Sequence, residues 1–324
     1  MRIKIPQTNS ELISLFVSLA SASLKISKII LHEPKRDVII RGQINLFLSA
    51  PFGETKSTIL KEIAAFHKTR VITKITAPAL VGTVDSRTSQ YIPASAWCCR
   101  NNFVLIDEFH LDNNELLIDA LLQIIEGGEY SKDIAKTCAD FCEADGELFC
   151  KSEKGKLSLK TRISAIITSM YDVGGKQSIL LKALLSRCIP IRYCLEYSEI
   201  QKIGAGEKLY LPHSELLSII RKGNKLKGGI EAVEIQEVDY MKILNFVHKF
   251  VTEKNKLYEK QCVSSNGAHY TSNDGKSLYL RSVGDCCRIF VILQEHDEIL
   301  YDLICTLKAT GGYWATTLNL RNPP

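Results

Sequence analysis

A lysine and a serine stand side by side at the start of a helical pattern, directly after a short loop that contains glycine. The apolar segment 44–48 leads into residues 49–57, which read SAPFGETKS, and a helical pattern follows over residues 58–67. In a strand, loop and helix of this kind, backbone N–H groups and the helix N-terminus can surround phosphate groups. Lys56 would then contact the β and γ phosphates of a nucleotide, and the Ser57 hydroxyl would hold Mg²⁺.

The loop departs from the usual phosphate-binding pattern at its glycine positions. That pattern has Gly six residues before the lysine and again one residue before it, and here Ala50 and Thr55 occupy those places. On this segment alone, a surface turn that contains Lys and Ser explains the residues equally well. The candidate nucleotide-binding residues are Ala50, Pro51, Phe52, Gly53, Glu54, Thr55, Lys56, Ser57 and Thr58.

Two adjacent carboxylates follow a second apolar segment. Residues 103–106, FVLI, are followed directly by Asp107 and Glu108. Ligands of open α/β sheets bind at the carboxyl ends of the strands, where Asp107 would complete the Mg²⁺ shell and Glu108 would orient and deprotonate an attacking water. A solvated strand edge is the alternative interpretation of the acid pair. Together the two segments favour hydrolysis of ATP, with ATP and Mg²⁺ bound at one site.

The elements that must position these residues alternate along the first part of the chain. Short apolar segments are separated by helical patterns, which predicts an α/β domain with a mostly parallel, five-stranded sheet. The predicted strands cover residues 44–48, 71–75, 103–106, 163–167 and 189–195.

The pattern becomes helical after about residue 200, most clearly over residues 238–251 and 278–293. We therefore predict an α/β nucleotide-binding domain over residues 1–199, a smaller helical domain over 200–309 and a tail over 310–324.

Several segments resemble the minichromosome maintenance (MCM) family of AAA+ helicases, in the same order along the chain. Residues 40–60, IRGQINLFLSAPFGETKSTIL, resemble its nucleotide-binding segment, and residues 102–112, NFVLIDEFHLD, resemble its Walker B strand. The other similar segments are 78–84 (PALVGTV, the start of an insertion in helix 2), 121–136 (LLQIIEGGEYSKDIAK, the start of the pre-sensor-1 hairpin), 156–167 (KLSLKTRISAII, the hairpin return and sensor-1 strand), 185–187 (LSR, the arginine finger) and 278–293 (the sensor-2 helix).

The resemblance implies an AAA+ P-loop NTPase with an N-terminal helix and a C-terminal α-helical lid, assembled into a ring, a hexamer in the family. It assigns Lys56, Ser57, Asp107 and Glu108 to ATP and Mg²⁺. Arg187 matches the arginine finger and Arg281 the sensor-2 arginine, and in the family both act on ATP bound by the neighbouring subunit. Such an arginine can contribute roughly 10³ to 10⁵ in rate.

The resemblance also implies contact with DNA. Lys136 matches a hairpin lysine that in the family points into the central channel and contacts nucleic acid. Further lysines surround the same hairpin, namely Lys132, Lys151, Lys154 and Lys156. They could follow a phosphate backbone, although a solvated run of charge explains them equally well.

The chain departs from the family at several positions. The predicted sensor-1 strand ends in Thr168, Ser169 and Met170 where an Asn is expected, so the Ser169 hydroxyl would have to position the water, and we expect slow hydrolysis. Cys188 follows Arg187 in place of Phe. We expect no counterpart of the family's large N-terminal DNA-binding domain in this chain and no winged helix at its end. So reduced a core would suit a virus, a plasmid or an integrated element.

Three functions remain open from the sequence. We favour a ring-forming, Mg²⁺-dependent ATPase that moves along single-stranded or forked DNA as a helicase or translocase in replication, with a replication initiator as a further partner. The second is a nucleotide-dependent switch or helicase loader with little turnover of its own. The third is an AAA+ remodeller of protein targets, although the sequence has no GAFTGA-like loop.

The amino-acid composition is typical of a folded protein. Hydrophobic residues make up 45% and charged residues 24%, and the formal net charge is +5, which permits a polyanionic partner without demanding one. The apolar stretch 12–24 contains four serines and is too short for a membrane span. Arg2 and Lys4 precede this stretch as in a signal peptide, but Glu11 and the basic residues that follow soon after argue against one.

The cysteines favour a reducing compartment. Their number is 11, an odd count, and they include the adjacent pairs Cys98–Cys99 and Cys286–Cys287, which makes a disulfide framework a poor fit. We therefore expect a cytoplasmic protein, in a prokaryotic cell or a virus-infected host. Cys138, Cys142 and Cys150 could be three zinc ligands, but their spacing favours ordinary thiols.

Overall fold

The chain is described by a computed structural model that covers most of its length. The described residues are 6–51, 53–73, 75–84, 87, 91–92, 102–109, 115–133, 142–144, 147–153, 156–160, 162–170, 179–207, 230–262 and 273–312. Phe52, Lys136, Cys138, Lys154 and the last twelve residues of the predicted tail, 313–324, lie outside them.

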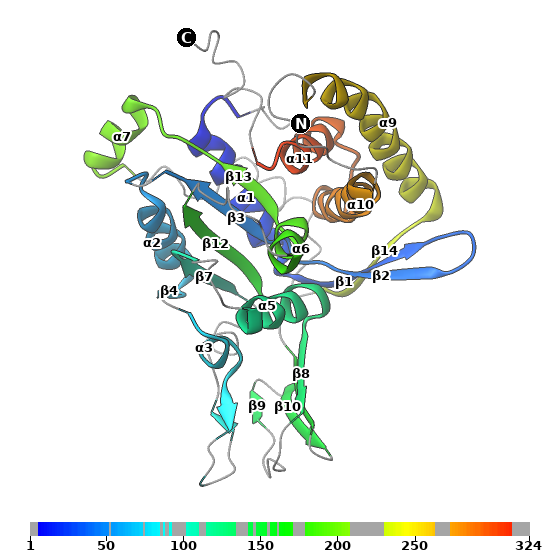
Figure 1. The fold of residues 1–324 in the computed structure, drawn as a ribbon. Coiled ribbons are helices and arrows are strands. Elements are labelled where there is room, and N and C mark those ends of the chain that lie inside the picture. Colours follow the sequence, from blue (N-terminus) through cyan, green and yellow to red (C-terminus); the bar gives the residue numbers. More distant parts are fainter. Residues whose placement is uncertain are drawn as a thin grey trace.

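A five-stranded, all-parallel sheet forms the centre of the fold (Figure 1), as the sequence predicts. Its strands in spatial order are β13 (Ile189–Arg192), β3 (Leu46–Ala50), β12 (Ser164–Met170), β7 (Phe103–Asp107) and β4 (Val71–Thr73). All residues of β3 and β7 are buried, which is usual for parallel strands covered on both faces. The predicted strand boundaries differ from these by up to three residues: β12 ends at Met170, β13 at Arg192 and β4 at Thr73.

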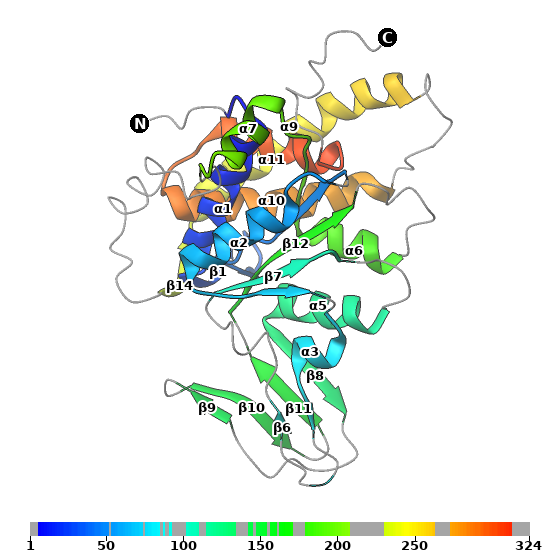
Figure 2. The same cartoon turned by 90° about the vertical axis from the view of Figure 1, so that its left-hand side faces the viewer.

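Helices cover both faces of this sheet. Helix α1 (Asn9–Ser23) and α2 (Lys56–His67) lie on one face, and α3 (Ala77–Val81), α5 (Glu115–Gly127) and α6 (Ile179–Arg187) lie on the other (Figure 2). Side chains of one strand alternate between the two faces. Accordingly, Leu46 and Leu48 of β3 pack in the core with α1 and α2, whereas Phe47 packs in the second core with α5.

A second, three-stranded sheet joins distant parts of the chain. Strand β1 (Ile26–His32) pairs antiparallel with β2 (Asp37–Arg41) and parallel with β14 (Ile230–Ile235). Helix α7 (Tyr197–Gly204) precedes β14, and α9 (Glu237–Cys262), α10 (Asn273–Leu293) and α11 (Glu298–Ala309) follow it. Residues of α1, α9, α10 and α11 share one core with the first face of the central sheet. The sequence pattern did not indicate this sheet, and β14 lies in the part predicted to be helical.

Two small antiparallel sheets extend from one end of the α/β unit, beyond α3 and α5 (Figures 1 and 2). The larger has the order β8 (Glu129–Asp133), β11 (Lys156–Lys160), β10 (Glu147–Glu153) and β9 (Cys142–Ala144). The smaller pairs β5 (Thr83–Val84) with β6 (Tyr91–Ile92). Strands β8 and β11 pair antiparallel, and β9 and β10 lie between them in the chain.

No helix in the described part of the chain has both the length and the apolar character needed to cross a membrane.

Candidate nucleotide site

The loop between β3 and α2 has the backbone conformation of a tight turn that ends at a helix N-terminus. Gly53 has a φ of 87° and Thr55 a φ of 39°, both in the left-handed region. Thr55 precedes the helix but gives it no side-chain capping bond, and the first turn of α2 carries no acidic residue. The partial positive charge of the helix N-terminus is therefore not offset by the usual capping groups, which makes it a suitable place for an anion.

One buried hydroxyl in this loop also lacks a partner. The Thr55 Oγ1 atom is buried and has no hydrogen bond to any residue that the structure describes. Buried polar groups are nearly always hydrogen-bonded in native proteins, so a buried hydroxyl without a partner indicates a candidate ligand contact. A phosphate oxygen in the loop would supply the missing acceptor, so the loop fits a bound nucleotide on this point.

Lys56 lies inside the loop, only 8% exposed. Its ammonium donates to the carbonyl oxygens of Ala50 (3.1 Å) and Pro51 (2.6 Å). Burial lowers the pKa of Lys56, and the nearby carboxylates of Asp107, Glu108 and Glu54 oppose that shift. The cation thus rests on neutral carbonyl groups and can transfer its hydrogen bonds to an entering phosphate.

Asp107 ends strand β7 at the same edge of the sheet. Strand β12 separates β7 from β3, and all three strands are parallel, so their carboxyl ends lie together. Asp107 is 6% exposed, and its Oδ1 atom accepts a hydrogen bond of 2.9 Å from the hydroxyl of Thr168. Burial and this bond fix the carboxylate beside the loop that holds Lys56.

The turn after Asp107 is attached to the neighbouring strand. The N–H of Glu108 donates to the Thr168 hydroxyl at 3.2 Å, and the N–H of Phe109 donates to the Thr168 carbonyl at 2.8 Å. Glu108 adopts a left-handed φ of 51°, which is uncommon outside glycine, and it is exposed. The turn therefore buries Asp107 and leaves the Glu108 carboxylate accessible to water and ligand.

Asp107 and Ser57 are the residues that could hold Mg²⁺. Ser57 is half-buried in the first turn of α2, next to Lys56. A carboxylate and a hydroxyl, completed by phosphate oxygens and waters, are the oxygen ligands that Mg²⁺ takes in nucleotide sites. The donor set therefore suits this cation.

Ser169, the residue that the sequence suggested here, does not contact Asp107, and its neighbour Thr168 does. The Ser169 hydroxyl donates to the Phe109 carbonyl at 3.1 Å, whereas the hydroxyl of Thr168 contacts Asp107. Neighbouring residues of a strand point to opposite faces, and only the tertiary pairing decides which of the two faces the acid. Thr168 is thus a site residue that the sequence reasoning missed.

Glu54 ties the phosphate loop to the segment after β13. Its carboxylate accepts hydrogen bonds from the N–H of Leu195 (2.9 Å) and the thiol of Cys194 (3.5 Å). Its carbonyl accepts one from the Tyr193 hydroxyl at 3.2 Å. The acid therefore serves as a loop anchor, a role that its place in the sequence did not indicate.

The two candidate arginines lie together, but at the opposite edge of the sheet. Arg187 ends α6 and comes two residues before β13 begins, so it lies at the amino ends of the strands, away from Lys56. Its Nε atom donates to Oε2 of Glu126 at 2.7 Å, with its Nη2 atom paired to the same oxygen. Arg281 donates from Nη2 to Oε1 of Glu126 at 3.1 Å.

Glu126 joins these arginines and was not singled out by the sequence. Burial raises the pKa of Glu126, but the hydrogen bonds from Arg187 and Arg281 outweigh burial, and the net shift is downward. The carboxylate therefore stays ionised and holds two cations side by side at the end of α5. Lys56, Asp107 and Glu108 form one group, and Arg187, Arg281 and Glu126 form a second group on the far edge.

The candidate zinc cysteines are only partly described. Cys142 and Cys150 are register partners in β9 and β10, and Cys138 lies outside the described residues. Within the described part of the chain, no three His, Cys, Asp or Glu side chains gather as a metal site.

Comparison of the sequence with models of known protein families, and with curated proteins, gives no match. The function is therefore inferred from the site geometry and from the motifs quoted above.

Proposed function

We propose that this chain is an MCM-like AAA+ P-loop ATPase whose C-terminal helices form its lid. The observation that supports the proposal most is the group at the carboxyl edge of the sheet, where a buried lysine, a helix N-terminus and a strand-end carboxylate come together. Ligands of open α/β sheets bind at this edge, between neighbouring strands whose connections leave in opposite directions. Strands β3 and β12 are such a pair, because the chain leaves β3 towards β4 at one side of the sheet and leaves β12 towards β13 at the other.

The residues of this group divide the work of hydrolysis between them. Lys56 and the N–H groups at the start of α2 bind and orient the phosphates. Ser57 and Asp107 would hold Mg²⁺, whose charge would neutralise the phosphate oxygens. Glu108, exposed beside them, accepts the proton of the attacking water.

The place of Arg187 and Arg281 supports an assembly of several copies. Both arginines lie on the edge opposite Lys56, so they are not placed to contact a nucleotide bound by their own chain. A ring, hexameric as in the family, would bring them against the nucleotide of the next copy. There they would stabilise the charge that develops on the transferred phosphate.

DNA is the proposed track of this assembly. Strands β8, β10 and β11 extend beyond the α/β unit and carry Lys132, Lys151 and Lys156. A ring would gather these strands from all copies, and lysines on them would follow a phosphate backbone without reading its sequence. Helicase or translocase work in replication is the activity that fits such a ring best.

One observation favours the second function, a nucleotide-dependent switch or helicase loader. The Ser169 hydroxyl donates to a backbone carbonyl, and the Thr168 hydroxyl donates to Asp107. Both donors at the end of β12 are engaged, so neither is free to position a water without a rearrangement. Slow turnover would follow from that arrangement.

The test is steady-state ATP hydrolysis by the purified chain with and without single-stranded DNA. A Glu108→Gln variant is the blank, because it keeps the size of the side chain and loses the base. Turnover that rises with DNA and disappears in the variant would support the motor. Nucleotide binding with no turnover above the blank would favour the switch, and absence of both binding and turnover would contradict the proposal.

A further inference from the structure

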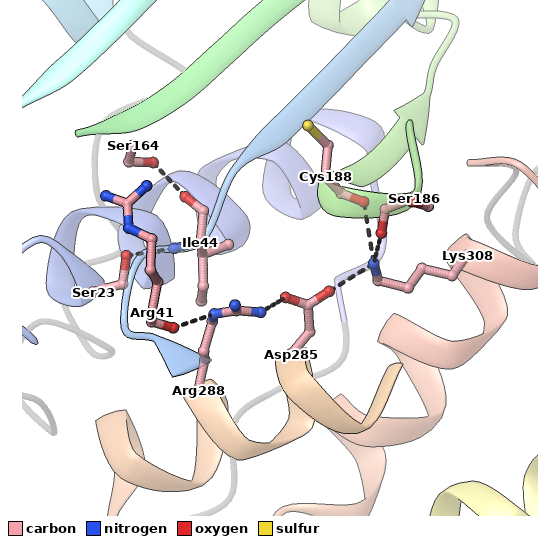
Figure 3. A network of polar contacts seen from close by, with 9 residues as sticks. All are labelled: Ser23, Arg41, Ile44, Ser164, Ser186, Cys188, Asp285, Arg288 and Lys308. Carbon is pink, nitrogen blue, oxygen red and sulfur yellow. Dashed lines mark hydrogen bonds and ion pairs between the residues drawn. The ribbon is translucent and has the colours of Figure 1, made fainter. Parts of the chain in front are cut away.

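A network of polar contacts joins charged groups of α10 and α11 to residues at the amino ends of the central strands (Figure 3). Its centre is Asp285 of α10, whose side chain is 5% exposed. Oδ1 of Asp285 pairs with Nη1 of Arg288 at 2.6 Å, and Oδ2 pairs with Nζ of Lys308 at 2.7 Å. One carboxylate therefore joins a cation of its own helix to a cation of α11.

Lys308 extends this network to the residues on either side of Arg187. Its ammonium donates to the carbonyl oxygens of Ser186 (3.1 Å) and Cys188 (3.2 Å). Its side chain is 4% exposed. Because all three bonds of the ammonium are directed at fixed acceptors, Lys308 holds the backbone at the point where Arg187 leaves helix α6.

The other arm of the network reaches the helix that carries Glu126. The Nε atom of Arg288 donates to the carbonyl of Arg41 at 2.9 Å. The guanidinium of Arg41 donates in turn to the carbonyls of Ile124, in the last turn of α5, and of Ile163 (3.3 Å). A cation at this place also complements the negative end of the α5 helix dipole.

Arg281 is attached to the same centre through helix α10. It precedes Asp285 by four residues, so both side chains lie on one face of that helix. Three helices therefore carry Arg187, Glu126 and Arg281. The network around Asp285 contacts each of these helices close to the residue that it carries. We call these three residues the arginine face.

The electrostatics explain why the network holds its shape. Burial raises the pKa of Asp285, but the charges and hydrogen bonds of Lys308 and Arg288 outweigh burial, and the net shift is downward. Buried ion pairs often add little net stability over apolar side chains of similar volume, yet breaking one is costly. Such a network suits the fixing of one geometry better than the strengthening of a core.

We infer that Asp285 is a positioning residue that holds the arginine face in one geometry, so that Arg187 and Arg281 meet the terminal phosphate of a nucleotide bound by the neighbouring copy. The inference rests on the proposed function, since it gives the arginine face its ligand. Asp285 touches no nucleotide itself and acts through Lys308 and Arg288.

The test is a mixing experiment in which each chain has only one of its two roles. A donor chain carries Lys56→Ala, which removes ATP turnover at its own nucleotide site, and an acceptor chain carries Arg187→Ala and has no arginine finger to offer. Mixed assemblies regain ATP hydrolysis only where a donor arginine meets an acceptor nucleotide. Asp285→Asn is then added to the donor alone or to the acceptor alone.

We expect Asp285→Asn in the donor to lower the regained hydrolysis roughly 100-fold, since small displacements of a catalytic group can cost that much. In the acceptor it should change the regained hydrolysis little. Asp239→Asn in the donor is the matched control, because it also removes an ion-paired aspartate of the helical part, next to His296 and Lys242. That control should leave the regained hydrolysis unchanged.

An equal loss in both positions, or no loss in the donor, would overturn the inference. If the donor and acceptor with Asp285 unchanged regain no ATP hydrolysis when mixed, there is no shared site between copies, and the proposed function is contradicted. Should the Asp285→Asn chain not fold by circular dichroism, Lys308→Met decides the question in the same mixing scheme. It removes the bonds to Ser186 and Cys188 but leaves Asp285 paired with Arg288.

Discussion

The hydroxyl of Thr168 connects the acid of the candidate site to its sheet. It donates to Asp107, accepts from the N–H of Glu108 and is fully buried. Loss of the hydroxyl would leave a buried carboxylate and a backbone N–H without their partner. At the scale of single residues, therefore, the site depends on a side chain that need not touch the nucleotide.

We predict that Thr168→Val lowers the free energy of unfolding by about 1 to 3 kcal/mol, the usual cost of an unsatisfied buried polar group. It should also lower ATP turnover, because Asp107 loses its fixed orientation. Thr168→Ser keeps the hydroxyl and is the matched control. Urea denaturation and steady-state hydrolysis measure the two effects. Equal behaviour of the Val and Ser variants would contradict the role given to this bond.

The sequence predicts single residues of this site only where they follow a pattern along the chain. Lys56 and Ser57 follow a strand and a glycine loop, and Asp107 ends an apolar strand, so spacing alone indicates them. Thr168 and Glu126 owe their place to contacts with residues 61 positions away. No local pattern encodes such contacts, which is why the sequence reasoning missed both residues.

At the scale of elements, the turn between β3 and α2 depends on a left-handed glycine. Gly53 has a φ of 87°, and a Cβ atom built there would meet no atom within 4 Å. A side chain at this position is therefore opposed by backbone conformation and not by crowding. Any substitution that forces the turn to relax will move the start of α2 and the Lys56 ammonium with it.

We predict that Gly53→Ala costs about 1 to 2 kcal/mol of stability, the price of a left-handed conformation with a Cβ atom. It should also weaken nucleotide binding. Gly204→Ala is the control, because Gly204 ends helix α7, also has open space around a Cβ atom and has no left-handed φ. Thermal unfolding and nucleotide titration measure both variants. If Gly53→Ala binds nucleotide as tightly as Gly204→Ala, the turn is not part of the site.

The elements differ in how far the sequence predicts them. The five central strands are runs of mainly apolar residues, fully buried in β3 and β7, and this signal is strong enough to place each of them within a few residues. Strand β2 is short and mostly exposed or half-buried, and β14 pairs with a strand about 200 residues earlier. Such a pairing leaves little trace in local periodicity, so the β14-β1-β2 sheet was missed.

At the scale of the whole molecule, one half-buried histidine makes stability depend on pH. His67 ends α2 and packs edge-on against Phe103, with ring centroids 4.7 Å apart. Burial lowers the pKa of His67 from 6.5 to about 4. The folded state therefore binds fewer protons at this residue than the unfolded chain between these two pKa values, and stability must fall as the pH falls through that range.

We predict a loss of about 3 kcal/mol at most from this residue between pH 6.5 and pH 4. His67→Phe replaces the ring with one that does not titrate, so its stability should depend less on pH over this range. Other titrating groups, including His32, affect both proteins alike. Urea denaturation at several pH values measures the difference. Equal pH dependence in both proteins would show that His67 titrates normally.

We propose that the carboxyl edge of the parallel sheet binds Mg²⁺-ATP through Lys56. The most direct measurement is equilibrium binding of a slowly hydrolysed, fluorescent ATP analogue in Mg²⁺ to the wild-type chain, Lys56→Ala and Lys61→Ala. Lys61 is the matched control, since it is an exposed lysine of the same helix. We expect Lys56→Ala to bind roughly 10- to 100-fold more weakly, the loss of charge-assisted hydrogen bonds, and Lys61→Ala to bind like wild type. Unchanged affinity in Lys56→Ala would contradict the site.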